Sequence, residues 1–337
     1  MLLVRTPVVQ IRSAQFMIVR LGGSQGGSRN AIDFSDVTST YSYSLRAVPL
    51  LAASQEGKDM PTPSIPSSQL AELLDWDETS SQEHFDAMDR LFESISDPEE
   101  VIALTQAWWA DPDERVQALG FDLLAVQALN FCWHVSPLIE AADALPLDRT
   151  HKHVRAATAH ALATICDDER VLGPLLRFAA DPDADIRWQV ARGIPVGADP
   201  LPEDAVRVLL ALMRDPDAEV RDWATMMLGS RAENDTKEIR DAFVERLDDP
   251  GANTAGEAAV ALAIRRDPRV LPTLKRVLAT PDVGNLYVEA AAELGDPELL
   301  PLLEGLKTDG WQDDDEQRPQ VLDQALQACA SRPASLA

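Results

Sequence analysis

Several patterns that mark common protein classes are scarce or missing in this 337-residue sequence. No run of 18 apolar residues occurs, so the chain offers no simple membrane-spanning helix. Aromatic residues make up 5% of the chain and all hydrophobic residues 45%, so a core must be built mainly from aliphatic side chains and alanine. No Cys-x-x-Cys pair and no G-x-G-x-x-G spacing occurs, so the sequence predicts neither a zinc or redox pair nor a nucleotide-binding loop.

Cysteine and histidine are too few and too scattered to predict a metal site. The three cysteines, Cys132, Cys166 and Cys329, lie far apart beside apolar helical patterns. We interpret them as buried free thiols in a reducing, cytoplasmic compartment. His153 and His160 share a helical face, but two helical turns separate them by about 10 Å. We therefore expect no metal and no cofactor.

Positive charge is also scarce. The chain has 56 acidic and 30 basic residues, for a formal net charge of −26. Residues 1–59 hold six basic and four acidic residues, so the acid excess lies entirely in the remainder. An acidic surface repels nucleic-acid phosphates and anionic membranes and speeds encounter with basic proteins. We expect no direct binding to nucleic acid or membrane, and a protein partner that is basic. The alternative is that the acids only keep the chain soluble.

The chain does contain a repeated motif. The stretch "DPDADIRWQV" (181–190) recurs 34 residues later as "DPDAEVRDWA" (215–224). Aligning on the aliphatic residue before Arg gives six copies with spacings of 32 to 38 residues. The anchors are Val116, Val154, Ile186, Val220, Thr254 and Leu286, and eight residues beyond them stand Leu124, Leu162, Ile194, Leu228, Leu262 and Leu294. The position four beyond each anchor is mostly small.

This pattern predicts stacked helix pairs. Apolar residues at positions zero, four and eight form one stripe of a helix, and small central residues let a neighbouring helix approach. Further apolar helices are predicted at 169–180, 203–214, 237–248, 268–279 and 297–307. A single pair cannot bury its own apolar face, so the pairs must stack. The Asp-Pro turns at Asp111, Asp181, Asp215 and Asp249 are predicted to start helices, with Pro as the first helical residue.

The pattern D-P-D-x-x-V-R-x-x-A-x-x-x-L resembles HEAT repeats, in particular the short type first recognised in phycobilisome lyases. The resemblance covers about 98–307 and implies an all-α superhelix, a HEAT-repeat solenoid. We predict this solenoid over 67–337, with terminal caps at about 67–97 and 311–331. Three copies depart from the pattern, with Gln117, Ala255 and Tyr287 in the place of Arg.

Residues 1–66 lack the repeat. They carry a Gly/Ser stretch and neither helix caps nor a sustained strand pattern, which favours a disordered or irregular N-terminal extension. Two alternatives remain: a short added β element, or an upstream segment ahead of a start at Met60.

The resemblance also implies which surface is open. In HEAT solenoids the second helix of each unit lines the concave face, and positions two, three and six beyond each anchor point away from the buried stripe. Trp, Arg and Met are favoured in interface cores. We predict a partner-binding concave face that includes Trp188, Arg192, Trp223, Met226, His160, Asp222 and Glu257. The alternative is that the tryptophans fill the core between units. The recurring Arg155, Arg187 and Arg221 are interpreted as ties between units, each pairing with an Asp of a neighbouring turn.

These observations favour a non-enzymatic scaffold or adaptor, a monomer that holds a protein partner in its groove. Di-iron hydroxylases of this architecture need His-Glu pairs, and this sequence has none. DNA glycosylases built from such repeats need a basic face. The main alternative is an acidic inhibitor or immunity-type protein that neutralises a basic nuclease or nucleic-acid-binding protein. A lyase or enzyme-accessory subunit is the third. A continuous acidic groove would favour the inhibitor, and an apolar groove centre the adaptor.

Overall fold

The computed structural model describes residues 65–74, 81–95, 98–131, 135–165, 168–194, 200–230, 232–280, 282–314 and 318–331. The chain divides into two units, Met1–Glu56 and Gly57–Ala337. All described residues belong to the second. The predictions for the N-terminal extension therefore lie outside the described residues, as do Cys132 and Cys166.

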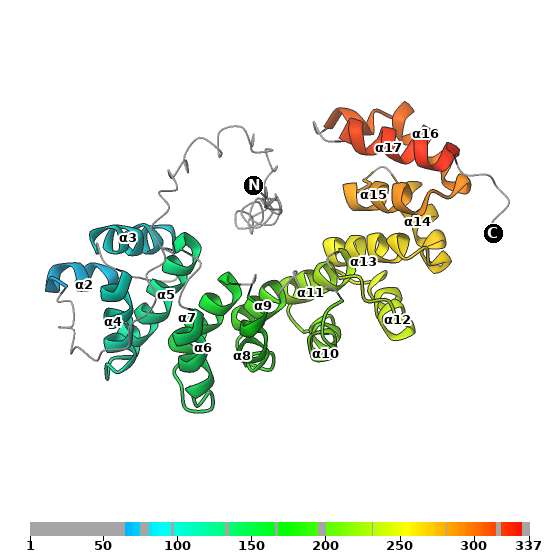
Figure 1. Cartoon of the computed structure of the whole chain (residues 1–337). Helices are drawn as coiled ribbons and strands as arrows, with labels where there is room; N and C mark the ends of the chain where they lie inside the picture. The colour runs from blue at the N-terminus through cyan, green and yellow to red at the C-terminus, as the bar shows by residue number, and fades with distance from the viewer. Residues whose placement is uncertain are drawn as a thin grey trace, which may run out of the picture. The chain divides into compact units, whose positions relative to one another are not determined.

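Every regular element of the described residues is helical, and the helices alternate between two rows (Figure 1). The odd row consists of α3 (Ser81–Ser94), α5 (Glu114–Phe131), α7 (Lys152–Thr164), α9 (Ala184–Gly193), α11 (Ala218–Ser230), α13 (Ala252–Ile264), α15 (Asn285–Leu294) and α17 (Arg318–Ser331). The even row consists of α2 (Ser67–Leu74), α4 (Pro98–Trp109), α6 (Val135–Ala144), α8 (Leu172–Leu176), α10 (Glu203–Leu212), α12 (Lys237–Arg246), α14 (Leu271–Leu278) and α16 (Leu300–Thr308). Short 3-10 turns precede α8, α14, α16 and α17, at η3 (Glu169–Val171), η4 (Pro268–Val270), η5 (Pro297–Leu299) and η6 (Trp311–Asp314).

Each helix of the odd row packs on the next odd helix and on the even helix that precedes it in the chain. The repeating unit is therefore an even helix followed by an odd one. A stack of such units is an all-α solenoid, which confirms the predicted fold class. The further apolar helices predicted from 169–180 to 297–307 are the helices of the even row, with boundaries within a few residues of those expected.

The predicted apolar stripe is the core of this stack. All six residues at position eight are buried, and so are five of the six anchors, with Leu286 only partly covered. Ala224, Ala258 and Ala290 at position four are fully buried. They belong to one continuous core that runs from α5 to α17, while a smaller core lies beneath α2 to α5.

Small residues let the odd helices lie very close together. A Cβ added to Gly193 would lie 2.4 Å from the Cβ of Ala163 on α7, and one added to Gly229 would lie 2.8 Å from the Cβ of Ala261 on α13. Real side chains do not approach this closely, so glycine at these two positions sets the separation between neighbouring odd helices.

The Asp-Pro turns correct the sequence prediction. Pro does not occupy the first helical position, because the helices begin two residues later, at Glu114, Ala184, Ala218 and Ala252. In the second copy of the "DPD" motif, Asp183 caps α9 by accepting from the Asp185 N–H, and Asp181 accepts from the Asp183 N–H. The turn thus contains two successive Asp side-chain-to-backbone bonds, so the second Asp is the cap. The side chain of the first Asp, Asp181, contacts the preceding unit.

At the C-terminal end, Trp311 of η6 closes the core. Its indole Nε1 donates to the Val283 carbonyl at 2.8 Å, and the Arg318 guanidinium lies 4.7 Å from the centroid of its ring. Cys329 of α17 is buried as a free thiol, as predicted, and burial raises its pKa to about 11.

Candidate protein-binding face of the odd-numbered helices

The seven predicted contact residues come from four consecutive odd helices. His160 lies on α7, Trp188 and Arg192 on α9, Asp222, Trp223 and Met226 on α11, and Glu257 on α13. Their positions follow from the repeat register, because the same helical phase recurs in every unit. The stack therefore places them in order along one row, as the sequence predicts.

The structure brings Trp188, Trp223 and Arg192 into direct contact. The two indole rings meet edge to face, with centroids 5.6 Å apart and planes at 83°. The Arg192 guanidinium lies 5.2 Å from the centroid of the Trp188 ring, and its Nε donates to Gln189 Oε1 at 2.8 Å. Edge-to-face aromatic pairs and cation–π contacts are both attractive. The Trp188 side chain is consequently held from two sides.

Burial divides the predicted residues into two groups and corrects part of the prediction. Trp223 is 6% exposed, and Asp222 and Glu257 are each 5% exposed. Trp188, Arg192, Met226 and His160 are partly exposed. The expectation that Trp223, Asp222 and Glu257 lie on the open face is therefore wrong for this structure, and Trp223 belongs to the core.

The reason is that α7, α9, α11 and α13 each have neighbours on three sides. An odd helix on each flank and an even helix below cover more of its circumference than one buried stripe would. Of positions two, three and six, position six stays open most often, and the residues there that are partly exposed are Asp122, His160, Arg192, Met226 and Ala292. Position three is covered in α5, α7, α11 and α13.

The histidines lie at two separate places on α7. His151 caps α7, its Nδ1 accepting from the His153 N–H at 3.4 Å, and its Nε2 lies 3.2 Å from a Glu114 carboxylate oxygen. His160 lies elsewhere, with Nδ1 3.8 Å from an Asp122 carboxylate oxygen. Among the described residues no three potential ligands gather around one point.

The recurring arginines tie unit to unit, as interpreted from the sequence. We call these contacts the arginine ladder: Arg155 with Asp181, Arg187 with Asp215, and Arg221 with Asp249. In each rung the Nε and Nη2 atoms donate to the two oxygens of one carboxylate, at 2.6 to 3.2 Å. The third nitrogen, Nη1, donates to a backbone carbonyl in the turn that precedes the arginine's own helix.

The rungs are nearly dry, which makes them strong. All three Asp side chains are buried and the Arg side chains are at most 13% exposed. Burial is the largest single influence on Asp215 and would raise its pKa, but the hydrogen bonds from Arg187 and the Asp217 N–H, together with the nearby positive charges, hold the pKa below its usual value. For Asp249 the bonds from Arg221 and the Gly251 N–H, with the charges of Arg221 and Arg246, lower the pKa against burial in the same way. Charged, bidentate pairs of this kind fix geometry as well as charge.

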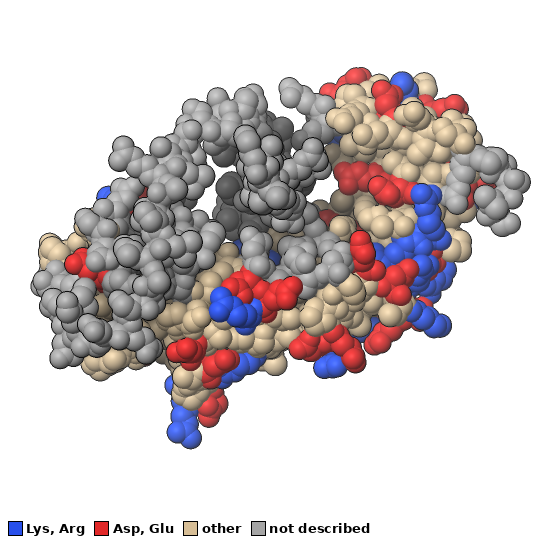
Figure 2. All heavy atoms as spheres, viewed as in Figure 1, with Lys and Arg blue, Asp and Glu red and all other residues tan. Residues whose placement is uncertain are grey.

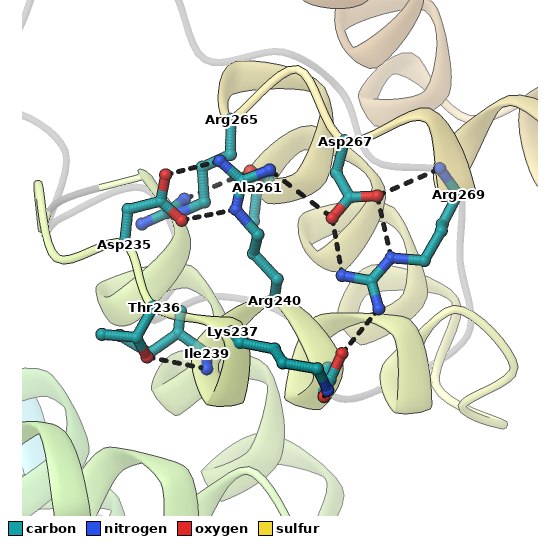
Figure 3. Close-up of polar contacts among 10 residues, drawn as sticks. Asp235, Thr236, Lys237, Ile239, Arg240, Ala261, Arg265, Asp267 and Arg269 are labelled. Carbon is teal, nitrogen blue, oxygen red and sulfur yellow. Dashed lines mark hydrogen bonds and ion pairs between the residues drawn. The ribbon is translucent and has the colours of Figure 1, made fainter.

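A second group of arginines was not recognised from the sequence. Figure 3 shows Arg265, Arg240 and Arg269 with Asp235 and Asp267 at the junction of α11, α12 and α13. The Asp235 carboxylate accepts from Arg240, and that of Asp267 accepts from Arg269. The one sequence signal is the base-rich stretch "RRDPR" (265–269), which follows the copy that has Ala255 in place of Arg.

On the described surface that Figure 2 shows, the acidic side chains do not form one continuous patch. Exposed acids stand in the first turns of helices of both rows, at Glu114, Asp185, Glu203, Asp204, Glu219, Glu238 and Glu298. Figure 2 shows Asp and Glu on the described surface in small groups beside Lys and Arg. Acids in a first turn are stabilised by the helix dipole, which accounts for their placement.

Comparison with known proteins identifies the repeat. The HEAT-repeat family model matches residues 206–286. The crystal structure of Escherichia coli YibA superposes on 80% of this chain and 93% of its own, with a TM-score of 0.61 at 22% identity. The chain is a HEAT-repeat protein. YibA sequences from Escherichia coli K12 and O157:H7 are each 33% identical to this HEAT-repeat protein over 156 residues, 45% of this chain. That stretch spans 54% of the relatives' length, about half.

An archaeal HEAT-like repeat protein from Thermococcus onnurineus is similar over 80% of this chain and 99% of its own, with a TM-score of 0.39 at 14% identity. In the described part of this HEAT-repeat protein, no helix is both long and apolar enough to cross a membrane.

Proposed function

We propose that this HEAT-repeat protein is a non-enzymatic adaptor that binds a protein partner on the open strip of its odd row. This open strip consists of the partly exposed side chains of Trp188, at its centre, Arg192 and Met226. The observation that carries the proposal is the restraint on this ring. Trp188 is partly exposed, its edge-to-face contact with Trp223 fixes one side, and Arg192 covers part of its face. An aromatic side chain that is already ordered loses little entropy on binding, and such residues dominate interface energies.

The chemistry around Trp188 suits a protein surface. Arg192 and Gln189 supply hydrogen-bonding groups on one side, and Met226 supplies a flexible apolar side chain on the next helix. Tryptophan, arginine and methionine are enriched in interface cores. The net charge of −26 would speed association with a basic partner and would do so less at high salt.

The inhibitor function is the second candidate, and the net charge favours it. The distribution of the acids weighs against it, because an inhibitor that imitates nucleic acid needs a continuous, solvent-facing acidic surface. Asp222 and Glu257, the acids predicted for the open face, are buried, and the acids on the described surface seen in Figure 2 stand in small groups beside Lys and Arg. The adaptor function is therefore the better supported of the two.

Site-directed crosslinking in the native host tests the proposal. A photoreactive amino acid at Met226 lies beside the proposed landing site without removing Trp188, and one at Arg207, exposed on α10 of the even row, is the matched control. The partner should crosslink from position 226 and not from 207, and mass spectrometry identifies it. Crosslinking from 207 alone would place the binding surface on the even row.

Affinity measurements with the identified partner then test Trp188 itself. Trp188→Ala should weaken binding by about 2 kcal/mol, roughly 30-fold, because truncating a hot-spot tryptophan costs that much or more. The Trp223 ring is unsuitable for this test since it is buried. Glu238→Ala on α12 is the control and should leave affinity unchanged. Equal affinity of Trp188→Ala and the parent chain would contradict the proposal.

A further inference from the structure

The arginine ladder stops before the end of the solenoid. Its last rung joins Arg221 of α11 to Asp249, in the turn before α13. The next arginine would stand at position 255 and join α13 to the turn before α15, but this residue is Ala255. Nevertheless, α13 packs against α15 as it does against α11. A different contact must therefore fix α13 to α15.

Arg265, directly after the last residue of α13, reaches back to α11. Its Nη1 donates to the Gly229 carbonyl at 2.7 Å and its Nη2 to the Leu228 carbonyl at 3.0 Å. Nη2 also donates to the carbonyls of Ala232 and Asn234, each at 3.0 Å. Leu228 and Gly229 lie in the last turn of α11, where carbonyls have no intrahelical partner and the helix dipole is negative. A guanidinium is well matched to this end, since it carries five donors and a permanent charge.

The environment of Arg265 differs from that of a ladder arginine. Its side chain is 5% exposed, and the guanidinium lies 5.1 Å from the centroid of the Phe243 ring. The nearest carboxylate contact is Asp235, at 3.9 Å from Nε. Main-chain carbonyls therefore supply most of the compensation for burying this charge. Burial lowers the pKa of Arg265, in contrast to the ladder arginines.

Arg266, the next residue, reaches in the opposite direction. Its Nη1 donates at 2.8 Å to the carbonyl of Leu294, the last residue of α15. Its backbone has φ of 53°, in the left-handed region. This conformation is unfavourable for a residue with a long side chain, so it persists only where surrounding contacts fix it. The reversal in chain direction at Arg266 is what sends two consecutive arginines to two different helices.

The loop that carries the pair is anchored on both sides (Figure 3). The Asp267 N–H donates to the Leu262 carbonyl at 2.9 Å, and the Asp267 carboxylate accepts from Arg269 and lies 3.6 Å from Arg240 of α12. Arg269 also donates to Asp241 of α12 at 2.6 Å. These contacts connect the loop to the even row, so Arg265 and Arg266 extend from a fixed base.

We propose that Arg265 and Arg266 form a two-way clasp that joins α11, α13 and α15 at their C-terminal ends and makes α15–α17 unfold together with α5–α13. In a solenoid each unit contacts only its neighbours, so cooperativity depends on the strength of every junction. The junction without a ladder rung is the place where the stack would otherwise separate into two independently unfolding sections.

Hydrogen exchange of the full chain, read by mass spectrometry at several urea concentrations, tests the clasp. In the parent chain the amides of α9 and α11 and those of α15 and α17 should follow one common urea dependence. Arg266→Asn keeps a residue that tolerates the left-handed backbone but is too short to reach Leu294. We expect exchange in α15 and α17 to rise by roughly tenfold or more while α9 and α11 stay protected.

Arg265→Met releases the end of α13 from α11 and loosens the loop that carries Arg266, so it should also give two unfolding transitions instead of one. Arg276→Met, which removes an exposed arginine of α14, is the matched control and should leave a single transition. If Arg265→Met fails to fold, Arg266→Asn decides alone. Uniform change in all four helices would overturn the clasp. So would greater protection in Arg266→Asn, because only the strain at φ of 53° would then have been removed.

Discussion

The ladder section, from α7 to α13, and the clasp at the end of α13 both join neighbouring odd helices, but their arginines bind different acceptors. In the ladder an arginine pairs with a carboxylate in the turn before the next odd helix. In the clasp two arginines bind backbone carbonyls at the ends of the previous and following odd helices. The ladder therefore pins the N-terminal ends of the odd helices, and the clasp pins the C-terminal ends.

The difference shows how an acidic protein uses its few bases. Arginines of the ladder and of the clasp are directed into junctions, where they satisfy buried acceptors. Arg177 and Arg246 do the same in the even row, donating to carbonyls at or just beyond the ends of α6 and α10. Exposed acids stand in helix first turns, as at Asp185 and Glu219, and elsewhere along the helices, as at Glu304. Several of the few bases are thus used to join units.

The largest expected effect is in the ladder. Asp215→Ala removes one partner of a dry pair and leaves the Arg187 guanidinium, 12% exposed, without its carboxylate. We expect a loss of about 4 kcal/mol in the free energy of unfolding, measured in urea, because an unpaired buried charge is costly. The capping bond to the Asp217 N–H alone would account for only about 1 kcal/mol.

The double variant Arg187→Met with Asp215→Ala is the control for this prediction. It removes both charges, so it should be more stable than Asp215→Ala alone. A double variant that is less stable by the sum of the two single losses would show that the rung acts through packing and not through charge.

A slightly smaller loss of stability is expected at the tryptophans of the ladder section, and it should differ between the two. Trp223→Ala should lower the free energy of unfolding by about 3 kcal/mol, because the ring is buried among core residues and leaves a cavity. Trp188→Ala should lower it by about 1 kcal/mol or less, since that ring is partly exposed. Urea unfolding of both variants measures the difference. Equal losses would contradict the assignment of Trp188 to the open strip.

Acid should weaken the ladder before it weakens the carbonyl contacts of the clasp. The pKa values of Asp215 and Asp249 lie below the value of about 3.9 expected for the unfolded chain. Their contribution to stability is therefore fully present above about pH 5 and is lost as pH falls through the lowered values. Between pH 7 and pH 3 we expect a loss of about 2 kcal/mol from these two groups, measured as a shift of the urea midpoint.

The clasp junction contains carboxylates too, since the bond from Arg240 lowers the pKa of Asp235 and the bond from Arg269 lowers that of Asp267. The comparison is therefore made with Asp215→Asn, which should show less loss between pH 7 and pH 3 than the parent chain. An identical pH dependence of the two chains would mean that the ladder rung does not titrate as expected.

The smallest expected effect lies beyond the clasp, at Glu289 of α15. Burial, and then the charge of Glu293 one turn away, raise the pKa of Glu289. A carboxyl with a raised pKa favours the folded state at low pH, and this contribution is lost as pH rises through the folded value. Glu289→Gln should therefore raise stability at pH 7 by less than about 1 kcal/mol, since the group is only partly buried. At pH 4 the gain should be smaller.

Glu304→Gln on α16 is the control for Glu289, because it removes an exposed acid from the neighbouring unit. It should change the urea midpoint little at either pH. A similar gain in both variants would show that relief of the general acidic repulsion, and not burial of Glu289, is responsible.

Repetition made the fold predictable. A position that recurs in six copies with the same phase, such as the anchors Val154 and Val220, indicates a buried stripe far more strongly than one helix could. The ladder was predictable for the same reason, since Arg155, Arg187 and Arg221 occupy one register position. The clasp was not, because Arg265 and Arg266 occur once and their acceptors are backbone carbonyls, which every residue has.

The sequence alone determined the unit, its length, the buried stripe and the ties between units, because these depend on helical periodicity and repeat register. Tertiary structure decided which side chains remain open. Trp188 at position two and Trp223 at position three were both predicted to be open, yet one lies on the strip and the other in the core. Their exposure depends on how closely three neighbouring helices pack around each ring. The phase of a single helix, which is what the sequence shows, does not determine how closely its neighbours pack.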